Sequence, residues 1–280
     1  MTGLTRPSLL QSGRLVALFV PATRPDRFGK ALSCGADAVI IDLEDAVGTA
    51  EKGQARAAVA AAIPAQGTVL LRINGAGTPW HADDMEMARD VPLAGIVLPK
   101  AESPDEVAEV AARVGRPVIA LIESARGLAA ARAIAAAPKV ARLAFGSIDF
   151  AADLGCAHTR DALLAARSEL VLASRLAGLD GPVDGVTTQV SDAALAEDDA
   201  RFAAALGFAG KLCIHPAQVA PAGAGFAPSP AEVAWAQRIV SALADGGSVV
   251  TVDGAMVDAP VRLRATRILA RAGLNEETQA

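Results

Sequence analysis

The 280-residue chain has no tyrosine, three histidines, three cysteines and only 3% aromatic residues. With so few aromatic side chains and a formal net charge of -5, it lacks the stacking platforms and the basic surface that nucleic-acid binding requires. Cys34, Cys156 and Cys213 are odd in number, widely spaced and outside any C-x-x-C pattern, which argues against a disulfide framework or a zinc knuckle. We therefore expect no nucleic-acid partner, and we interpret the cysteines as small buried apolar residues.

Long hydrophobic runs are also missing, although 52% of the residues are hydrophobic. No uninterrupted stretch approaches the roughly 20 apolar residues that cross a bilayer, and residues 1–14 lack the apolar middle of a secretory signal. We expect a cytoplasmic protein without a membrane partner. The chain has no Walker A motif and no G-x-G-x-x-G opening a helix, and Ser147 lies outside any G-x-S-x-G elbow. These absences disfavour nucleotide hydrolysis, dinucleotide binding and a Ser-His-Asp hydrolase.

What the chain does contain is a repeated unit, a short β-rich apolar run whose last residues turn charged or polar. Eight such runs occur, at residues 15–20, 38–43, 69–73, 95–98, 118–122, 142–145, 183–186 and 212–214. Helix-forming segments separate them, and one begins with the capping sequence Ser103-Pro104-Asp105-Glu106. This alternation predicts an α/β fold, a (β/α)8 TIM-type barrel formed by residues 1–220.

Residues 221–280 are predicted to form a C-terminal linker and a helical extension. The stretch 217–230 is rich in Pro, Ala and Gly, which is typical of a linker that leaves the barrel. Helices are expected at about 230–244 and 261–272, with a turn or short hairpin between them. Because this extension is too small to be a domain alone, we expect it to pack on the barrel or on a neighbouring subunit.

Charged side chains gather where the apolar runs end. If the runs are parallel strands, these ends share one rim of the barrel, where enzymes of this fold carry out their chemistry. The side chains at the ends are Asp42, Glu44, Asp45, Arg72, Lys100, Glu123, Asp149 and His215. Carboxylates crowded together repel one another unless a cation shares the space, and carboxylates without clustered His or Cys suit Mg²⁺. The alternative for Asp42, Glu44 and Asp45 is a role as helix caps or in ion pairs.

The other polar residues at this rim have more than one interpretation. Arg72 is suited to hold a substrate carboxylate in a bidentate fork, and the alternative is a structural salt bridge to Glu44 or Asp42. Lys100 is a candidate Schiff-base nucleophile, a contact to a phosphate or thioester tail, or a solvated lysine. Nothing near it indicates desolvation, so we favour binding or solvation. His215 is the best placed of the three histidines and is either a substrate contact or a hydrogen-bonded structural residue.

Seven segments, in this order, resemble the landmarks of one known family. They are 18–22 (LFVPA), 36–47 (ADAVIIDLEDAV), 72–74 (RIN), 98–100 (LPK), 122–127 (IESARG), 146–155 and 214–219 (IHPAQV). Together they resemble the citrate lyase beta-subunit-like proteins of the HpcH/HpaI aldolase superfamily over nearly the whole chain. The D-L-E-D-A-V and I-H-P segments are highly specific to that family.

The resemblance implies a TIM-type barrel with a Mg²⁺ ion that cleaves or forms a carbon–carbon bond between an α-keto acid and an acyl-CoA enolate. By position, Glu123 and Asp149 match the family's two metal carboxylates. Arg72 matches the arginine that holds the keto-acid carboxylate. Glu44 and Asp45 match acids that order this arginine and the metal-bound water.

The tail segment 253–260 resembles a motif whose second aspartate, Asp258 here, reaches a neighbouring subunit's site in malyl-CoA and citramalyl-CoA lyases. This implies a homotrimer or hexamer, with Asp258 or metal-bound water as the group that transfers the proton. One position departs from the family, because Ile148 stands where an acidic residue commonly precedes the ligand aspartate. We expect this change to tune the site or the choice of substrate.

We therefore predict a Mg²⁺-dependent lyase for a β-hydroxyacyl-CoA such as citryl-, malyl- or citramalyl-CoA, with oxaloacetate, glyoxylate or pyruvate as the keto acid. A further thioester hydrolysis step is compatible with this reaction. The predicted catalytic residues are Arg72, Asp258, Glu44 and Asp45, and the predicted substrate contacts are Arg72, Glu123, Lys100 and His215. The alternatives are a CoA-independent pyruvate aldolase and a citrate lyase subunit that works only with an acyl carrier partner.

Overall fold

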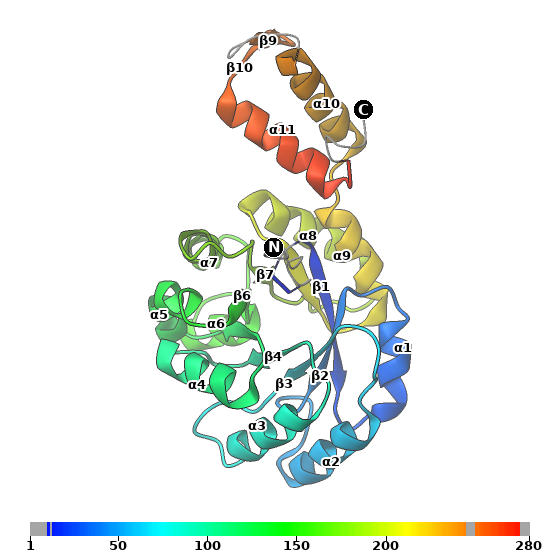
Figure 1. Cartoon of the computed structure of the whole chain (residues 1–280), viewed down its shortest axis with the longest axis vertical. Coiled ribbons are helices and arrows are strands. Elements are labelled where there is room, and N and C mark those ends of the chain that lie inside the picture. The colour runs from blue at the N-terminus through cyan, green and yellow to red at the C-terminus, as the bar shows by residue number, and fades with distance from the viewer. Residues whose placement is uncertain (1–9, 12, 245–249, 275–280) are drawn as a thin grey trace, which may run out of the picture. The chain divides into compact units, whose positions relative to one another are not determined.

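The computed structural model describes residues 10–11, 13–244 and 250–274, and the chain divides into two compact units, Met1–Phe226 and Ala227–Ala280. In the first unit, eight parallel strands follow one another in sequence order around a closed barrel (Figure 1). They are β1 (Leu15–Pro21), β2 (Ala38–Asp42), β3 (Val69–Arg72), β4 (Gly95–Leu98), β5 (Val118–Ile122), β6 (Val140–Phe145), β7 (Val183–Asp184) and β8 (Gly210–Cys213). Pairing of β1 with both β2 and β8 closes the ring. The predicted (β/α)8 barrel is confirmed.

Helices connect the strands and surround the barrel (Figure 1). They are α1 (Phe28–Leu32), α2 (Lys52–Ala62), α3 (His81–Asp90), α4 (Pro104–Val114), α5 (Ala125–Ala135), α6 (Ser147–Leu154), α7 (Leu164–Leu176), α8 (Ala193–Leu206) and α9 (Val219–Phe226), with short 3₁₀ turns η1 (Pro25–Arg27), η2 (Thr49–Glu51) and η3 (Pro216–Gln218). The capping sequence before α4 works as expected, because the Ser103 hydroxyl accepts the Asp105 N–H at 3.2 Å. Gly115 ends that helix with a left-handed φ of 75°.

Two apolar layers stabilise the barrel. One cluster takes residues from every strand and from none of the described helices, so it fills the inside of the barrel; Ala17, Ile40, Leu70 and Leu212 belong to it. A larger cluster lies between the strands and the helices around them. Successive strand residues alternate between the two clusters, as the two-residue period of a β-strand requires.

This alternation decides which polar side chains reach the inside of the rim. Residues two positions beyond the inward-facing Ile40 and Leu70 are Asp42 and Arg72, and these two are direct partners across β2 and β3. By the same alternation, Glu123 follows the inward-facing Leu121 directly after β5. The pairing of the strands therefore brings these polar side chains together at the rim, as the strand ends predicted.

The opposite end of the barrel is closed by the chain that precedes β1. Arg142, on β6, has no exposed surface and donates to the carbonyl oxygens of Leu10 at 2.8 Å, Gly13 at 2.6 Å and Gly181 at 3.2 Å. A buried guanidinium requires such acceptors for its donors. Leu10 itself belongs to the cluster inside the barrel, so it completes the core at the end opposite the carboxyl rim.

The expectation of a linker from residue 217 is wrong for its first part. Residues 216–226 form η3 and α9, and the first compact unit ends at Phe226. Small residues in this stretch permit close packing: a Cβ on Gly225 would lie 2.6 Å from the Ala200 Cβ on α8, which is too close for any side chain. The small residues that suggested a linker instead allow α8 and α9 to pack closely.

The second unit contains α10 (Pro230–Ala244), a hairpin of β9 (Val250–Val252) and β10 (Ala255–Val257), and α11 (Ala259–Arg271). Residues 245–249 of the expected turn lie outside the described residues. A small core of its own includes Ala236, Ile239, Ile268 and Leu269. The expected helices are present, and the packing of this unit on the barrel or on another subunit stays a prediction.

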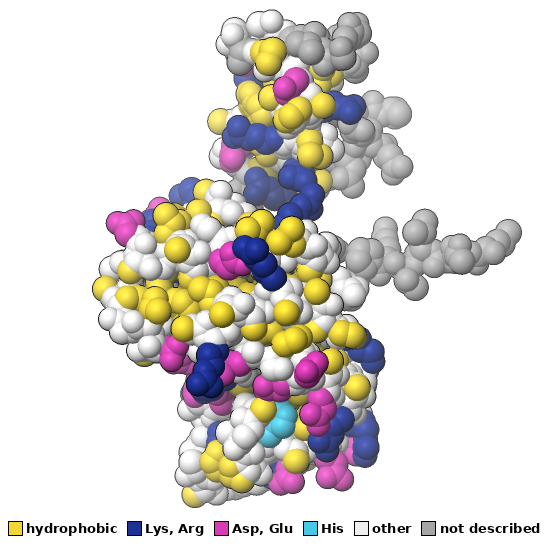
Figure 2. All heavy atoms as spheres, turned by 90° about the vertical axis from the view of Figure 1, so that its left-hand side faces the viewer, with side chains coloured by type: hydrophobic (Ala, Val, Ile, Leu, Met, Phe, Trp, Pro, Cys, Tyr) yellow, Lys and Arg dark blue, Asp and Glu magenta, His cyan; other side chains and the backbone are white. Residues whose placement is uncertain are grey.

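The surface gives two further observations. On the face of the barrel shown in Figure 2, lysine and arginine side chains lie among aspartate and glutamate, with apolar side chains scattered between them. Across the part of the chain that is described, no helix is both long enough and apolar enough to span a membrane.

The three cysteines are thiols without disulfide bonds. Cys213 is buried, and its burial raises its pKa to about 12, so it is inert at neutral pH. Cys34 and Cys156 are only partly buried, which corrects the expectation of burial for these two.

Candidate active site

Arg72, the last residue of β3, is 8% exposed and is held by acids from β2 and the loop after it. Its Nε and Nη2 donate to the two carboxylate oxygens of Asp42, each at 2.7 Å, and its Nη1 lies 2.9 Å from Glu44 Oε2 and 3.2 Å from Asp45 Oδ2. Burial alone would lower the pKa of Arg72, but the bonds to Asp42 and the nearby acids raise it above its ordinary value. The Phe19 ring lies beneath the guanidinium, with 4.8 Å between its centroid and Cζ. The salt-bridge alternative for Arg72 is therefore realised, while Arg72 also lines the cavity at this rim.

Asp42 has a second structural task. Its carboxylate oxygens accept the backbone N–H groups of Glu44 at 2.9 Å and Ala46 at 3.1 Å, which shapes the turn after β2. The same turn is held from below by Lys52, whose buried ammonium donates to the carbonyl oxygens of Leu43 and Glu44, each at 2.7 Å. Asp42 therefore acts as a local cap and as the partner that orients Arg72.

Lys100 connects two of the carboxylates. Its Nζ donates to Glu44 Oε1 at 2.6 Å, and its backbone N–H donates to Glu123 Oε1 at 2.7 Å. The residue adopts a left-handed φ of 49°, which is unusual for a side chain other than glycine and directs the N–H to Glu123. The bond to Glu44 outweighs burial and raises the pKa of Lys100, so the ammonium stays charged. Lys100 is thus engaged by acids and is no desolvated nucleophile.

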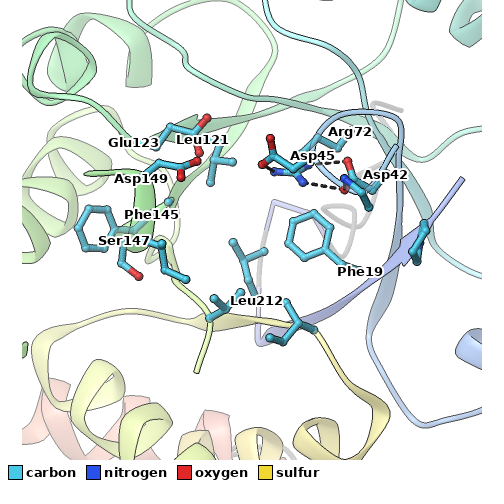
Figure 3. A pocket seen from close by; sticks show the side chains of 16 residues that line it. Phe19, Asp42, Asp45, Arg72, Leu121, Glu123, Phe145, Ser147, Asp149 and Leu212 are labelled. Atoms are coloured by element: carbon cyan, nitrogen blue, oxygen red, sulfur yellow. Dashed lines mark hydrogen bonds and ion pairs between the residues drawn. The ribbon is translucent and has the colours of Figure 1, made fainter. Parts of the chain in front are cut away.

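Glu123 and Asp149 meet at the carboxyl end of the barrel, and Figure 3 shows both side chains directed into the cavity. Glu123 is 4% exposed, and Asp149 lies in the first turn of α6. Burial, then the charges of Glu44 and Asp149, raise the pKa of Glu123 to about 8. Gly146 makes room for this carboxylate, because a Cβ there would lie 2.5 Å from the Glu123 Cβ. Two close carboxylates without a compensating cation are the arrangement that a hard metal ion stabilises.

The cavity that these residues line has a volume of about 470 Å³. Asp42, Asp45, Arg72, Glu123 and Asp149 contribute its charged surface. The remaining lining side chains are mostly apolar, including Leu121, Phe145, Ile148, Val186, Leu212 and Ile214. Among the described residues, no three or more His, Cys, Asp or Glu side chains are arranged as a complete metal cage. A metal held here takes its other ligands from substrate and water.

His215 does not line this cavity. It is exposed, and its Nδ1 accepts the Ala217 N–H at 3.2 Å, so it caps η3. It does line a neighbouring groove of about 720 Å³ together with Arg24, Arg27 and Lys30. The groove and the cavity share Phe19, Pro21 and Ile214, so the two spaces adjoin.

Asp258 belongs to the second compact unit, where its carboxylate accepts the Val261 N–H at 3.3 Å and caps α11. Its predicted catalytic role in a neighbouring subunit stays a prediction.

Several residues that shape the site have no recognisable pattern around them in the sequence. The Ser147 hydroxyl lies 2.9 Å from His158 Nε2. Arg24, Arg27 and Lys30 lie in and after the first loop, where a basic residue has no distinguishing pattern. Lys52 starts a helix and finds its acceptors only in the folded chain. Each of these partnerships depends on tertiary contacts, so no local spacing could have indicated them.

The closed parallel barrel, with an arginine and two carboxylates lining a cavity at its carboxyl rim, has the site architecture of a barrel enzyme. Residues 15–216 match the family model for HpcH/HpaI aldolase/citrate lyase, and the chain belongs to this family of lyases. The family resemblance inferred from the sequence motifs is confirmed.

Individual relatives are similar to this chain over nearly its full length. The chain is 38% identical to the citrate lyase subunit beta-like protein of Mycobacterium tuberculosis strain H37Rv, over 91% of this chain and 94% of that one. It is 35% identical to the (3S)-malyl-CoA thioesterase of Cereibacter sphaeroides strain ATH 2.4.9, over 91% and 93%. Among solved structures, CitE from M. tuberculosis in complex with magnesium, acetoacetate and coenzyme A superposes with a TM-score of 0.86 at 37% identity, covering 94% of this chain and 99% of that one.

Proposed function

We propose that this enzyme is a Mg²⁺-dependent carbon–carbon lyase that cleaves or forms a β-hydroxyacyl-CoA, with an α-keto acid and an acyl-CoA as the other partners. Citryl-, malyl- and citramalyl-CoA are the candidate substrates. The observation that carries this proposal is the presence of Arg72, Glu123 and Asp149 in one cavity at the carboxyl end of the barrel. Relatives named as citrate lyase beta-like proteins and malyl-CoA thioesterases support it.

The donor set fits Mg²⁺. Glu123 and Asp149 offer carboxylate oxygens, and Mg²⁺ is commonly bound by one or two carboxylates with water and substrate completing its shell. Burial, followed by the charge of Glu44, raises the pKa of Glu123, and a cation beside it would favour the charged carboxylate. When bound, Mg²⁺ supplies Lewis-acid stabilisation of negative charge that develops on substrate oxygens. A related CitE structure contains magnesium and acetoacetate, which supports the same assignment.

Arg72 is positioned to orient the keto-acid carboxylate. Asp42 holds the Nε and Nη2 edge of the guanidinium, and Phe19 supports its face, so its orientation is set before substrate binds. Lys100 and Arg72 both pair with Glu44, which keeps that buried acid close to the substrate site. For proton transfer, a metal-bound water and Asp258 of the partner subunit stay the two candidates, the latter in a homotrimer or hexamer.

The neighbouring groove suits the CoA part of the substrate. Arg24, Arg27 and Lys30 line it together with Asp26, which pairs with Arg24 at 2.8 Å, and cations of this kind bind phosphate groups. The groove adjoins the cavity through Phe19, Pro21 and Ile214, so a thioester arm can pass from one to the other. His215 lines the same groove and is proposed as a contact to this arm.

The decisive experiment assays the purified full chain with citryl-, malyl- and citramalyl-CoA and detects both the acyl-CoA and the keto acid. We expect cleavage that requires Mg²⁺, stops in EDTA and returns when Mg²⁺ is added. Full activity in EDTA would contradict the metal role, and borohydride trapping at Lys100 would indicate a Schiff base instead. Turnover of pyruvate with aldehydes alone would support the CoA-independent aldolase. Activity only after addition of an acyl carrier protein would support a citrate lyase subunit.

A further inference from the structure

Glu123 and Asp149 lie on different elements, so their separation depends on how those elements are joined. Glu123 directly follows β5, and Asp149 lies in the first turn of α6. Before the two acids, the Gly146 N–H donates to the Ile122 carbonyl oxygen at 2.9 Å. Ile122 directly precedes Glu123, and Gly146 directly precedes α6. This bond holds the two segments together on one side of the acids.

Asp153 joins the same two segments on the other side of the acids. It lies one helical turn after Asp149 on α6, so the two side chains share a face of this helix. Its Oδ2 accepts the Ala125 N–H at 2.7 Å. Ala125 is the first residue of α5, and only Ser124 separates it from Glu123. The two hydrogen bonds therefore enclose Glu123 and Asp149, with one bond before the acids and one after them.

The position of Asp153 is unfavourable for α6 taken alone. Asp153 is the next-to-last residue of the helix, where a negative charge opposes the helix dipole, and the last turn has no basic residue. The start of α5 is the opposite case, because free N–H groups there favour a carboxylate. Ser124 accepts the Gly127 N–H at 3.1 Å, which leaves the Ala125 N–H to Asp153. Such a conflict between local preference and tertiary contact is typical of residues with a functional role.

The Asp149 carboxylate depends on its helix for its position. Within the part of the chain that the structure describes, it has no hydrogen-bond or ion-pair partner, whereas Glu123 accepts the Lys100 N–H at 2.7 Å. The helix is held by its buried Phe150 and by the bond from Asp153 to α5. Of these two contacts, the second connects α6 to the segment beside Glu123.

We propose that Asp153 is a positioning residue that sets the separation of Glu123 and Asp149, and thereby the affinity of the cavity for Mg²⁺. The inference rests on the proposed function and adds a residue outside the cavity on which metal binding depends. Asp153 is exposed and does not line the cavity, so it acts through its bond to Ala125 rather than by touching metal or substrate. Without this bond, the arrangement in which both acids reach one ion is less populated.

The test compares Asp153→Ala with Asp153→Asn. Alanine removes both the charge and the acceptor, whereas asparagine keeps an oxygen that can accept the Ala125 N–H. In calorimetric titrations of the metal-free chain, we expect Asp153→Ala to weaken Mg²⁺ binding about tenfold, the low end of the effect of groups that orient metal ligands. Asp153→Asn should stay within about threefold of the unmodified chain, because asparagine and aspartate are similar acceptors for helix N–H groups. In assays, Asp153→Ala should need more Mg²⁺ for half-maximal rate but reach a near-normal kcat.

Ala125→Pro removes the donor of the same hydrogen bond. Proline is favoured at the first position of a helix, and the extended backbone of Ser124, with φ of -143° and ψ of 161°, suits the residue before a proline. This variant should weaken Mg²⁺ binding as much as Asp153→Ala does. The double variant should bind no more weakly than either single variant, because both changes remove one bond. Additive losses would show that the two residues act independently, which overturns the inference.

Asp192→Ala is the matched control. Asp192 is also exposed, and its Oδ1 accepts the Leu195 N–H at 2.9 Å in the first turn of α8, but it does not line the cavity. Each alanine variant loses one carboxylate bond to a helix N-terminus, so their urea midpoints should fall by similar amounts. Only Asp153→Ala should lose affinity for Mg²⁺, which distinguishes positioning from general stability.

The outcomes separate this inference from the proposed function. Normal Mg²⁺ affinity in Asp153→Ala, with Mg²⁺-dependent cleavage, would overturn the inference and leave the lyase standing. Equal weakening in Asp153→Ala and Asp153→Asn, or in Asp192→Ala, would assign the effect to charge or stability and also overturn it. Absence of Mg²⁺ binding in the unmodified chain would contradict both. The expected order of affinities without turnover of any thioester would contradict the lyase proposal alone.

Discussion

Two buried arginines at opposite ends of the barrel are satisfied in different ways. At the closed end, Arg142 is fully buried and donates to the carbonyl oxygens of Leu10, Gly13 and Gly181, and its Nη2 also lies 3.5 Å from Asp180 Oδ2. At the open end, Arg72 is bound by the carboxylates of Asp42, Glu44 and Asp45. Burial lowers the pKa of Arg142, whereas the acids around Arg72 raise its pKa above the ordinary value.

The difference shows which end is built for binding. The bonds of Arg142 are mainly to backbone carbonyl oxygens and fix the chain, whereas Arg72 is held by acids and lines a cavity. At the open end, burial and then the charges of Glu44 and Asp149 raise the pKa of Glu123 to about 8. Carboxylates crowded into one cavity favour the binding of a cation, in agreement with the Mg²⁺ proposed for this end. Local electrostatics therefore identify the functional end independently of the general rule for barrels.

The largest expected effect comes from removing the carboxylates that define the open end. Glu123→Gln and Asp149→Asn should each lower kcat/KM by about 10³-fold at saturating Mg²⁺, because stabilisation of developing charge is lost. Steady-state assays with calorimetric titration of Mg²⁺ check this. Glu109→Gln, on the exposed side of α4, is the matched control and should be unchanged. Normal Mg²⁺ affinity in both site variants would show that the metal binds elsewhere.

The two arginines should separate activity from stability. Arg72→Lys keeps the charge but loses the bidentate fork, so we expect kcat/KM to fall about 100-fold, mainly through KM for the keto acid. Arg142→Lys strands buried carbonyl groups and should lower the free energy of unfolding by about 2–4 kcal/mol, with near-normal activity of the folded enzyme. Urea denaturation and steady-state kinetics measure both. If both variants lost activity and stability together, the distinction between a binding role for Arg72 and a structural role for Arg142 would be wrong.

The metal-free enzyme should lose stability as pH rises. The pKa of Glu123 is about 8 in the folded chain against an ordinary value of 4.5, so between these values the folded state holds a proton that the unfolded chain has released. The stabilising contribution is complete below about pH 4.5 and is lost progressively towards pH 8, at about 1.4 kcal/mol per pKa unit at most.

Urea midpoints at pH 5.5 and pH 8 in EDTA measure this dependence. Glu123→Gln should reduce the difference between the two midpoints, and Mg²⁺ should reduce it in the unmodified enzyme. Glu109→Gln serves as the control for removal of an exposed carboxylate. A slope that is the same with and without the Glu123 carboxyl would refute the assignment.

The smallest effect is expected at Lys100, where two variants distinguish the contribution of the side chain from that of the backbone. Lys100→Gly removes the ammonium but accepts the left-handed backbone, whereas Lys100→Ala removes the ammonium and retains the cost of a φ of 49°. We expect Lys100→Gly to lower kcat/KM by about tenfold, and Lys100→Ala to lower it further with weaker Mg²⁺ binding. Equal behaviour of the two variants would show that the backbone N–H to Glu123 contributes nothing measurable.

Much of this architecture was predictable because it repeats. Each strand combines an apolar run with a polar end, so strand order and the residues at the rim, including Arg72 and Glu123, follow from local patterns. The error at 217–226 has a physical cause, since small residues suit both loose linkers and close helix contacts. The basic groove, the Ser147–His158 bond and the buried Lys52 depend on partners distant in sequence. No pattern within a single segment contains that information.

Gly146 gives the carboxylate of Glu123 its place by contributing only a hydrogen atom beside it. Its φ of -82° is open to any residue, so the requirement at this position concerns space rather than backbone conformation. Even the smallest added group, a methyl, would overlap the Glu123 side chain and displace its carboxylate. An alignment scored only by chemical similarity would pass over this position, yet the spacing between the two acids depends on it.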